Sequence, residues 1–146
     1  MKARTSIIAA GAAVVLGTTG AFVLPAVASA HTASTTLKFT SVQKASINFS
    51  KTEFGQQDTD VNATGKTIGF DMLNITAVSA TTGNVNITGN FKGGFLYGTG
   101  TINFKTGVFS NGKVTGGTGA FKGATGTITA KNISSTKTAV TITYSG

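Results

Sequence analysis

The stretch NVNITGNFKGGFLYGTGTINF, residues 84–104, decides the fold class. Small or apolar residues alternate with Asn, Thr and Tyr on both sides of the segment Lys92-Gly93-Gly94. Alternation with a period of two is typical of a β-strand with one apolar face. Two such runs joined by a short glycine-containing turn indicate an antiparallel hairpin. This stretch therefore predicts two neighbouring strands.

The same alternation recurs along the chain, over 37–49, 68–75, 124–130 and 140–144. Turn-forming segments separate the runs, and Asn111-Gly112 is the strongest of them because both residues tolerate a type I′ hairpin. At Met72-Leu73 the apolar residues change parity, which predicts a bulge or a turn. No helical period intervenes, and glycines inside the strands favour a small closed barrel over a flat sandwich. We expect an all-β fold, an eight-stranded antiparallel β-barrel formed as one domain by residues 31–146.

Residues 1–30 have the three parts of a secretory signal peptide. Lys2 and Arg4 precede an apolar stretch over 7–24, which Pro25 and the small residues Ala28-Ser29-Ala30 follow. An uncleaved membrane anchor is the alternative, but the proline and the Ala-Ser-Ala segment favour cleavage after Ala30. The sequence therefore predicts a secreted protein that has no membrane attachment after cleavage.

The charge of the mature chain is dispersed. Without Lys2 and Arg4, ten lysines face four acids, and no arginine and no cysteine are left. The lysines stand singly from Lys38 to Lys137, whereas a nucleic-acid groove needs a concentrated basic patch. We therefore expect no nucleic-acid partner. The lysines are interpreted as residues that keep strands soluble and protect their edges, with a loose attraction to an anionic cell wall as the alternative.

Few residues of the chain are of the types that carry catalysis. His31 is the only histidine, which excludes Ser-His-Asp and Cys-His catalysis and multi-histidine zinc sites. Asp58, Asp60 and Asn62 have the spacing of the first ligands of a calcium loop, but Ala63 and Gly69 stand where that loop needs Gly and Glu. A solvated turn is favoured over a calcium site. We predict no metal and no cofactor.

Residues 116–126, Gly-Gly-Thr-Gly-Ala-Phe-Lys-Gly-Ala-Thr-Gly, resemble the signature Gly-Gly-Thr-Gly-x-Phe-x-x-Ala-x-Gly of the allene oxide cyclase and dirigent proteins. Phe95-x-Tyr97-Gly98-Thr99 and the terminal run 139–144 are similar to further strands of that family. The resemblance implies a calycin-like eight-stranded barrel with an apolar cavity, often assembled as a homo-trimer. It also implies an isomerase or cyclase that steers ring closure or coupling of small hydrophobic substrates. Dirigent proteins use an Asp with an Arg, and the chain after Ala30 has no arginine.

The predicted function is that of a secreted barrel that binds a small hydrophobic molecule. Cyclase-like or isomerase-like steering of the bound molecule is a further possibility, so the sequence leaves open whether the protein is an enzyme. Carboxyls at a barrel mouth can act as general acids, and Asp58, Asp60 and Tyr97 are the candidate catalytic or polar groups. Aromatic side chains line such cavities or simply fill the core; the candidate ligand-binding residues are Phe39, Phe70, Phe91, Tyr97 and Phe104. The alternative is a non-enzymatic extracellular structural or interaction protein with a fully packed barrel.

Overall fold

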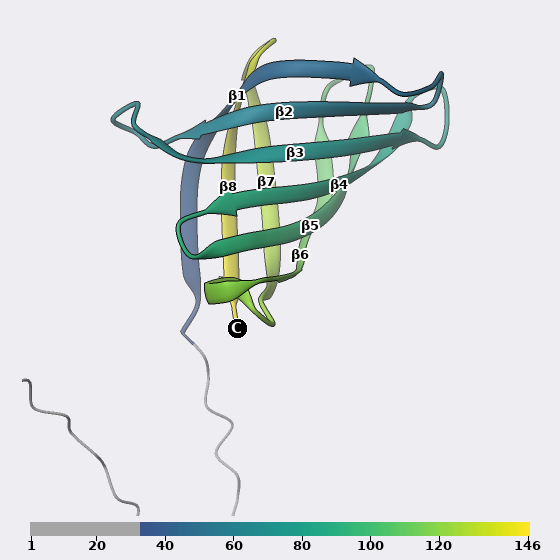
Figure 1. Ribbon diagram of the computed structural model, residues 1–146. Helices are drawn as coiled ribbons and strands as arrows, with labels where there is room; N and C mark the ends of the chain where they lie inside the picture. The colour runs from purple at the N-terminus through teal and green to yellow at the C-terminus, as the bar shows by residue number, and fades with distance from the viewer. Residues whose placement is uncertain (1–32) are drawn as a thin grey trace, which may run out of the picture. The chain divides into compact units, whose positions relative to one another are not determined.

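The computed structural model describes residues 33–146, which form a closed barrel of eight antiparallel strands paired in chain order (Figure 1). The all-β class and the eight-stranded barrel are therefore confirmed. The predicted signal peptide, its cleavage site and His31 lie outside the described residues. The strands are β1 (Thr35–Asn48), β2 (Glu53–Val61), β3 (Thr67–Ala77), β4 (Thr82–Phe91), β5 (Gly94–Asn103), β6 (Phe109–Gly117), β7 (Thr125–Ser134) and β8 (Lys137–Ser145).

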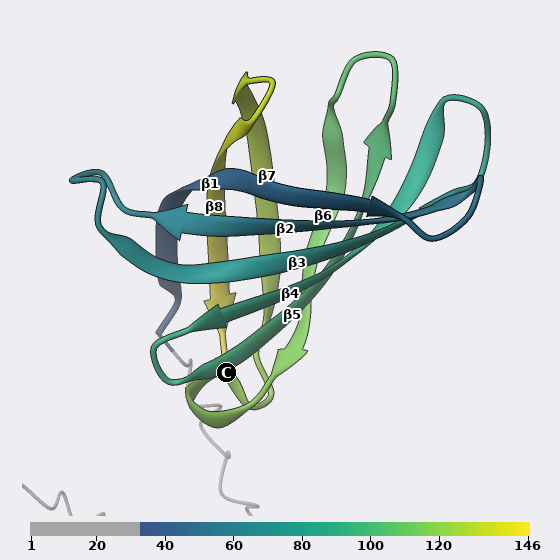
Figure 2. The ribbon, with the colours of Figure 1, turned by 45° about the horizontal axis from the view of Figure 1, so that its top comes forward.

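Strand β1 closes the barrel because it belongs to two parts of the wall. Its first part, Thr35–Val42, pairs with β8, and its second part, Thr40–Asn48, pairs with β2. A bulge between Gln43 and Ala45 marks the change, as bulges bend a strand and increase its twist. Figures 1 and 2 show β1 running beside β8 and then turning to run beside β2. The whole hydrogen-bonded circuit lies within residues 35–145.

Asn111-Gly112 is not a hairpin turn, so this prediction is wrong. Both residues lie inside β6, where Thr99 pairs with Lys113 and Thr101 pairs with Ser110. Two residues of β6 thus stand opposite the single residue Gly100, which is a β-bulge. Asn111 has φ of 54°, so the property that suits Asn-Gly to a type I′ turn also suits it to this bulge.

The predicted break at Met72-Leu73 is also wrong, because β3 pairs with β2 and β4 through this point without a register shift. Leu73 and Ile75 line the interior together with Asp71. Phe70 and Met72 have the opposite parity and are exposed on the outer face. The apparent change of parity arose because the outward-facing row of β3 carries Phe70 and Met72, whereas the inward-facing row has the buried carboxyl of Asp71 before Leu73.

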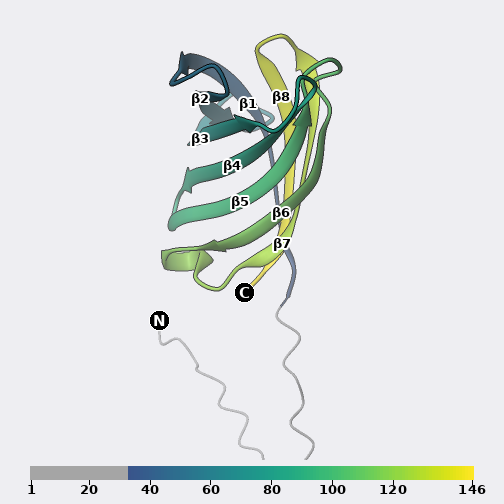
Figure 3. The same cartoon turned by 90° about the vertical axis from the view of Figure 1, so that its right-hand side faces the viewer.

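A short 3₁₀ helix, η1 (Gly119–Phe121), covers one end of the barrel, which we call the closed end (Figure 3). Phe121 is buried there and packs edge-to-face against Phe91 and Tyr144, at centroid distances of 6.2 and 5.5 Å. Phe39 extends this aromatic cluster at 5.4 Å from Phe91. Such rings stabilise a core by large buried area and favourable ring geometry. Within residues 33–146, no helix has the length and apolar character needed to span a bilayer.

Candidate functional site

A cavity of about 240 Å³ lies inside the barrel. Inward-facing positions alternate with outward-facing ones along every strand. The inward-facing residues that line the cavity are mainly apolar. The cavity extends to the end opposite η1, where Gly107 of the β5–β6 loop and Ser134, Ser135 and Thr136 of the β7–β8 hairpin form its rim. The apolar lining includes Phe39, Leu73, Ile75, Val85, Ile87, Phe91, Leu96, Ile102, Phe109, Ile128, Ala130, Val140 and Ile142.

One wall of this cavity is acidic. Asp58 of β2 stands directly opposite Asp71 of β3, and both side chains line the cavity. Asp60, two residues after Asp58, faces the same interior and is fully buried. Ser41 is the register partner of Asp60 on β1. Strand alternation therefore places three carboxyl groups and one hydroxyl on the inner faces of three adjacent strands, which we call the acidic wall.

Asp58 is well provided with hydrogen-bond donors. Ser41 Oγ donates to Asp58 Oδ2 over 2.6 Å, and Gln56 Nε2 lies 2.9 and 2.8 Å from Asp58 Oδ1 and Oδ2. Both carboxyl oxygens of Asp58 therefore have a side-chain donor. Ser41 Oγ also lies 3.3 Å from Asp71 Oδ2, but one hydroxyl proton cannot serve both carboxylates fully.

Asp60 and Asp71 have few hydrogen-bond donors around them. Both oxygens of Asp60 and Oδ1 of Asp71 are buried and have no donor among residues 33–146. Burial, followed by the charge of Asp71, raises the pKa of Asp60 from its ordinary 3.8 to about 8. Burial, followed by the charge of Asp58, raises the pKa of Asp71 to about 6. At neutral pH a proton on Asp60 is therefore shared with Asp71, as expected for neighbouring carboxyls that cannot both ionise.

The structure brings four of the predicted site residues together. Asp58, Phe39 and Phe91 line the cavity, and Asp60 stands behind them in the acidic wall. The other three lie elsewhere. Tyr97 and Phe70 are 37% and 45% exposed on the outer face, and Phe104 packs against Phe54 beside a separate shallow depression.

Three residues of the site were not predicted from the sequence: Ser41, Gln56 and Asp71. Asp71 carried a usable signal, because it shares parity with Leu73 and Ile75 and so had to face the same side of the strand. Ser41 carried the same kind of signal, because it shares parity with Leu37 and Phe39. Gln56 carried a weaker one, because the residues that share its parity in β2 are mainly polar.

The calcium alternative is not supported by this geometry. Asp58 and Asp60 lie on a strand and face the barrel interior, whereas Asn62 lies in the β2–β3 turn. Asn62 Oδ1 accepts hydrogen bonds from the backbone of Thr64 and Lys66, so it caps that turn. Within the described part of the chain, no group of three His, Cys, Asp or Glu side chains has an arrangement that could hold a metal ion.

Comparisons with known proteins show the fold. No family model matches this chain, and no curated protein matches it. Among solved structures, it is similar to a protein described as pyocyanin demethylase, with a TM-score of 0.56 and 13% sequence identity. The match covers 76% of this chain and 100% of the other. At this identity the likeness shows a shared barrel architecture.

Proposed function

We propose that this protein binds a small hydrophobic molecule inside its barrel. The observation that carries the proposal is the cavity of about 240 Å³, whose wall is apolar except for a few convergent polar groups. Ligand pockets commonly combine these two features. An apolar cavity of about 150 Å³ is enough to hold benzene, so the larger space here fits a two-ring molecule. A fully packed barrel, the alternative expected from the sequence, would leave no such space.

Two further observations support the proposal. The solved structure with a similar barrel is named as an enzyme for pyocyanin, so a barrel of this shape is compatible with a small-molecule substrate. The resemblance of residues 116–126 to allene oxide cyclase and dirigent proteins implies the same kind of ligand. In acid-assisted cyclisation Asp71, which lines the cavity, would donate a proton to a bound intermediate, and the protonated Asp60 behind it would replace that proton.

Filling the cavity should weaken ligand binding. Ala130 of β7 lines the cavity, and Ala130→Phe would place a ring in that space. We expect the purified wild-type protein to bind 2-naphthalenemethanol with a Kd below about 1 mM and the variant to bind at least about tenfold more weakly. Isothermal titration calorimetry measures both affinities.

The matched control is Thr129→Phe, which puts the same ring one residue away on the exposed face of β7. This variant should bind like wild type, and both variants should unfold cooperatively. Undiminished binding by Ala130→Phe would place the ligand outside the cavity and contradict the proposal.

We also propose that the protein is exported and cleaved after Ala30. The support is the order of the charged, apolar and small-residue segments in residues 1–30. N-terminal sequencing of protein recovered from the culture medium should begin at His31. Recovery only in the membrane fraction with Met1 retained would contradict this proposal.

A further inference from the structure

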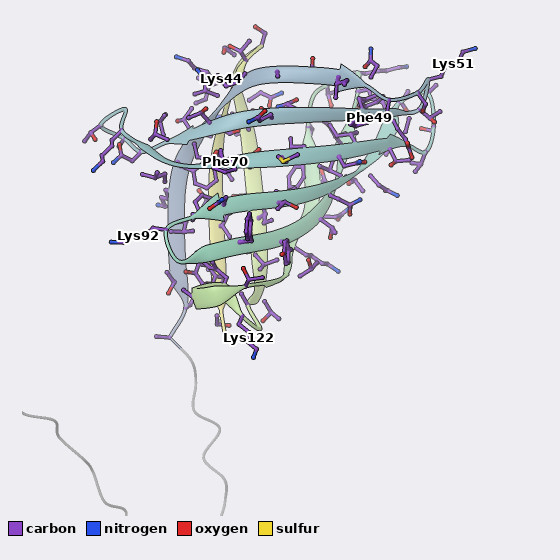
Figure 4. The ribbon with its side chains drawn as sticks, viewed as in Figure 1. Lys44, Phe49, Lys51, Phe70, Lys92 and Lys122 are labelled. Carbon is purple, nitrogen blue, oxygen red and sulfur yellow. The ribbon has the colours of Figure 1, made fainter. Side chains whose placement is uncertain are left out.

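The acidic wall has no positive counterpart among the residues around the cavity. None of the side chains that line the cavity is Lys, Arg or His. None of the ten lysines of residues 33–146 lines the cavity. Lys51, Lys92 and Lys122 extend away from the barrel at its turns (Figure 4). The protein is basic overall, with a formal charge of +8, yet its interior is acidic. The interior charge is therefore left without a protein partner.

One shared proton does not give every buried carboxyl oxygen of the acidic wall a hydrogen-bond donor. A proton shared between Asp60 and Asp71 supplies one donor for three unpartnered oxygens and brings no positive charge to the wall. Asp58 and Asp71 then carry negative charge close together, since they are directly opposite each other on β2 and β3. Buried charges in proteins are normally paired, because removing an ion from water costs several kcal/mol. Asp71, 6% exposed, lines the cavity, and its Oδ1 has no donor among residues 33–146.

We propose that the cavity takes ligands with an apolar body of about two rings and a cationic nitrogen, which pairs with Asp71 and Asp58. This inference rests on the proposed function, because it names the class of ligand for the same cavity. The apolar rings would contact side chains such as Ile87 and Ile128, and the nitrogen would supply the donor and the positive charge that the acidic wall lacks. A charge-assisted hydrogen bond in a dry site is stronger than a neutral one. An anionic ligand of the same size would be repelled.

Three probes with one shared ring system separate charge from shape: (2-naphthylmethyl)ammonium, 2-naphthalenemethanol and 2-naphthoate. Calorimetry at pH 7.5 with the wild-type protein should give an affinity for the ammonium at least about tenfold above that for the alcohol. The naphthoate should bind more weakly than the alcohol. In Asp71→Asn the preference for the ammonium over the alcohol should fall to less than about threefold.

Glu53→Gln is the matched control, because it removes an exposed carboxylate from the same strand as Asp58 and should leave all three affinities unchanged. Equal affinities for ammonium and alcohol in the wild type would overturn this inference and leave the proposed function intact. A preference for the ammonium that survives in both Asp71→Asn and Asp58→Asn would also overturn it. Binding of none of the three probes would instead contradict the proposed function.

Discussion

Replacing Gly126 with valine is expected to prevent the barrel from closing. A Cβ atom built on Gly126 would lie 2.0 Å from Thr143 O and 2.8 Å from Tyr144 Cα, both in the backbone of the neighbouring strand β8. Backbone atoms cannot turn away as a flexible side chain can, so β7 and β8 would have to separate. The pairing of Gly126 with Tyr144 lies beside the aromatic cluster at the closed end.

We expect Gly126→Val to lower the free energy of unfolding by more than about 4 kcal/mol, a large part of the 5–15 kcal/mol typical of a domain. Chemical denaturation followed by far-ultraviolet circular dichroism measures the change. Thr127→Val is the matched control, since it places the same side chain at the next, exposed position of β7 and should change stability by less than about 0.5 kcal/mol. Equal stability of the two variants would contradict the close approach of β7 and β8.

The protein is expected to lose stability as the pH rises from about 4 to 8. The pKa values of Asp60 and Asp71 are raised to about 8 and about 6, whereas both carboxyls have an ordinary value of 3.8 in the unfolded chain. Between these values the folded state holds protons that the unfolded state has released, so stability falls with increasing pH. The groups that face this pair are Asp58 on β2, Ser41 on β1 and the uncharged Gly89 on β4.

The expected loss between pH 5 and pH 8 is roughly 5 kcal/mol, most of it from Asp60, since each unit of pKa difference corresponds to about 1.4 kcal/mol. Asp60→Asn should flatten this dependence and be more stable than wild type at pH 8, because an amide donates a hydrogen bond to Asp71 without carrying charge. Urea unfolding at several pH values measures the effect, with Glu53→Gln as the exposed control. A wild-type stability that rises from pH 5 to pH 8 would contradict the raised pKa values.

The fold could be predicted from the sequence because strand alternation and turn spacing are local signals. Residues 84–104 form most of β4, the turn after it and all of β5, close to the predicted hairpin. The register could not be predicted, because it depends on bulges near Ala45, Val61 and Asn111 that the local pattern does not distinguish from turns. The register sets Asp58 opposite Asp71, so the acidic wall appears only in three dimensions.

The aromatic residues show a second limit of sequence reasoning. Phe39, Phe91 and Phe70 all stand in alternating runs, but the first two are buried and Phe70 is 45% exposed. When both faces of a strand carry apolar residues, alternation does not say which face is inside. Tyr97, a neighbour of the fully buried Leu96, is exposed for the same reason. The homo-trimer that the family resemblance implies stays a prediction.

The most direct test of the central claim is a crystal structure of the protein grown with (2-naphthylmethyl)ammonium. We expect electron density for the ring system among the apolar residues of the barrel cavity, with the nitrogen within hydrogen-bond distance of a carboxylate oxygen of Asp71 or Asp58. A barrel interior filled by rearranged side chains, with the probe absent or bound only on the outer face, would contradict it.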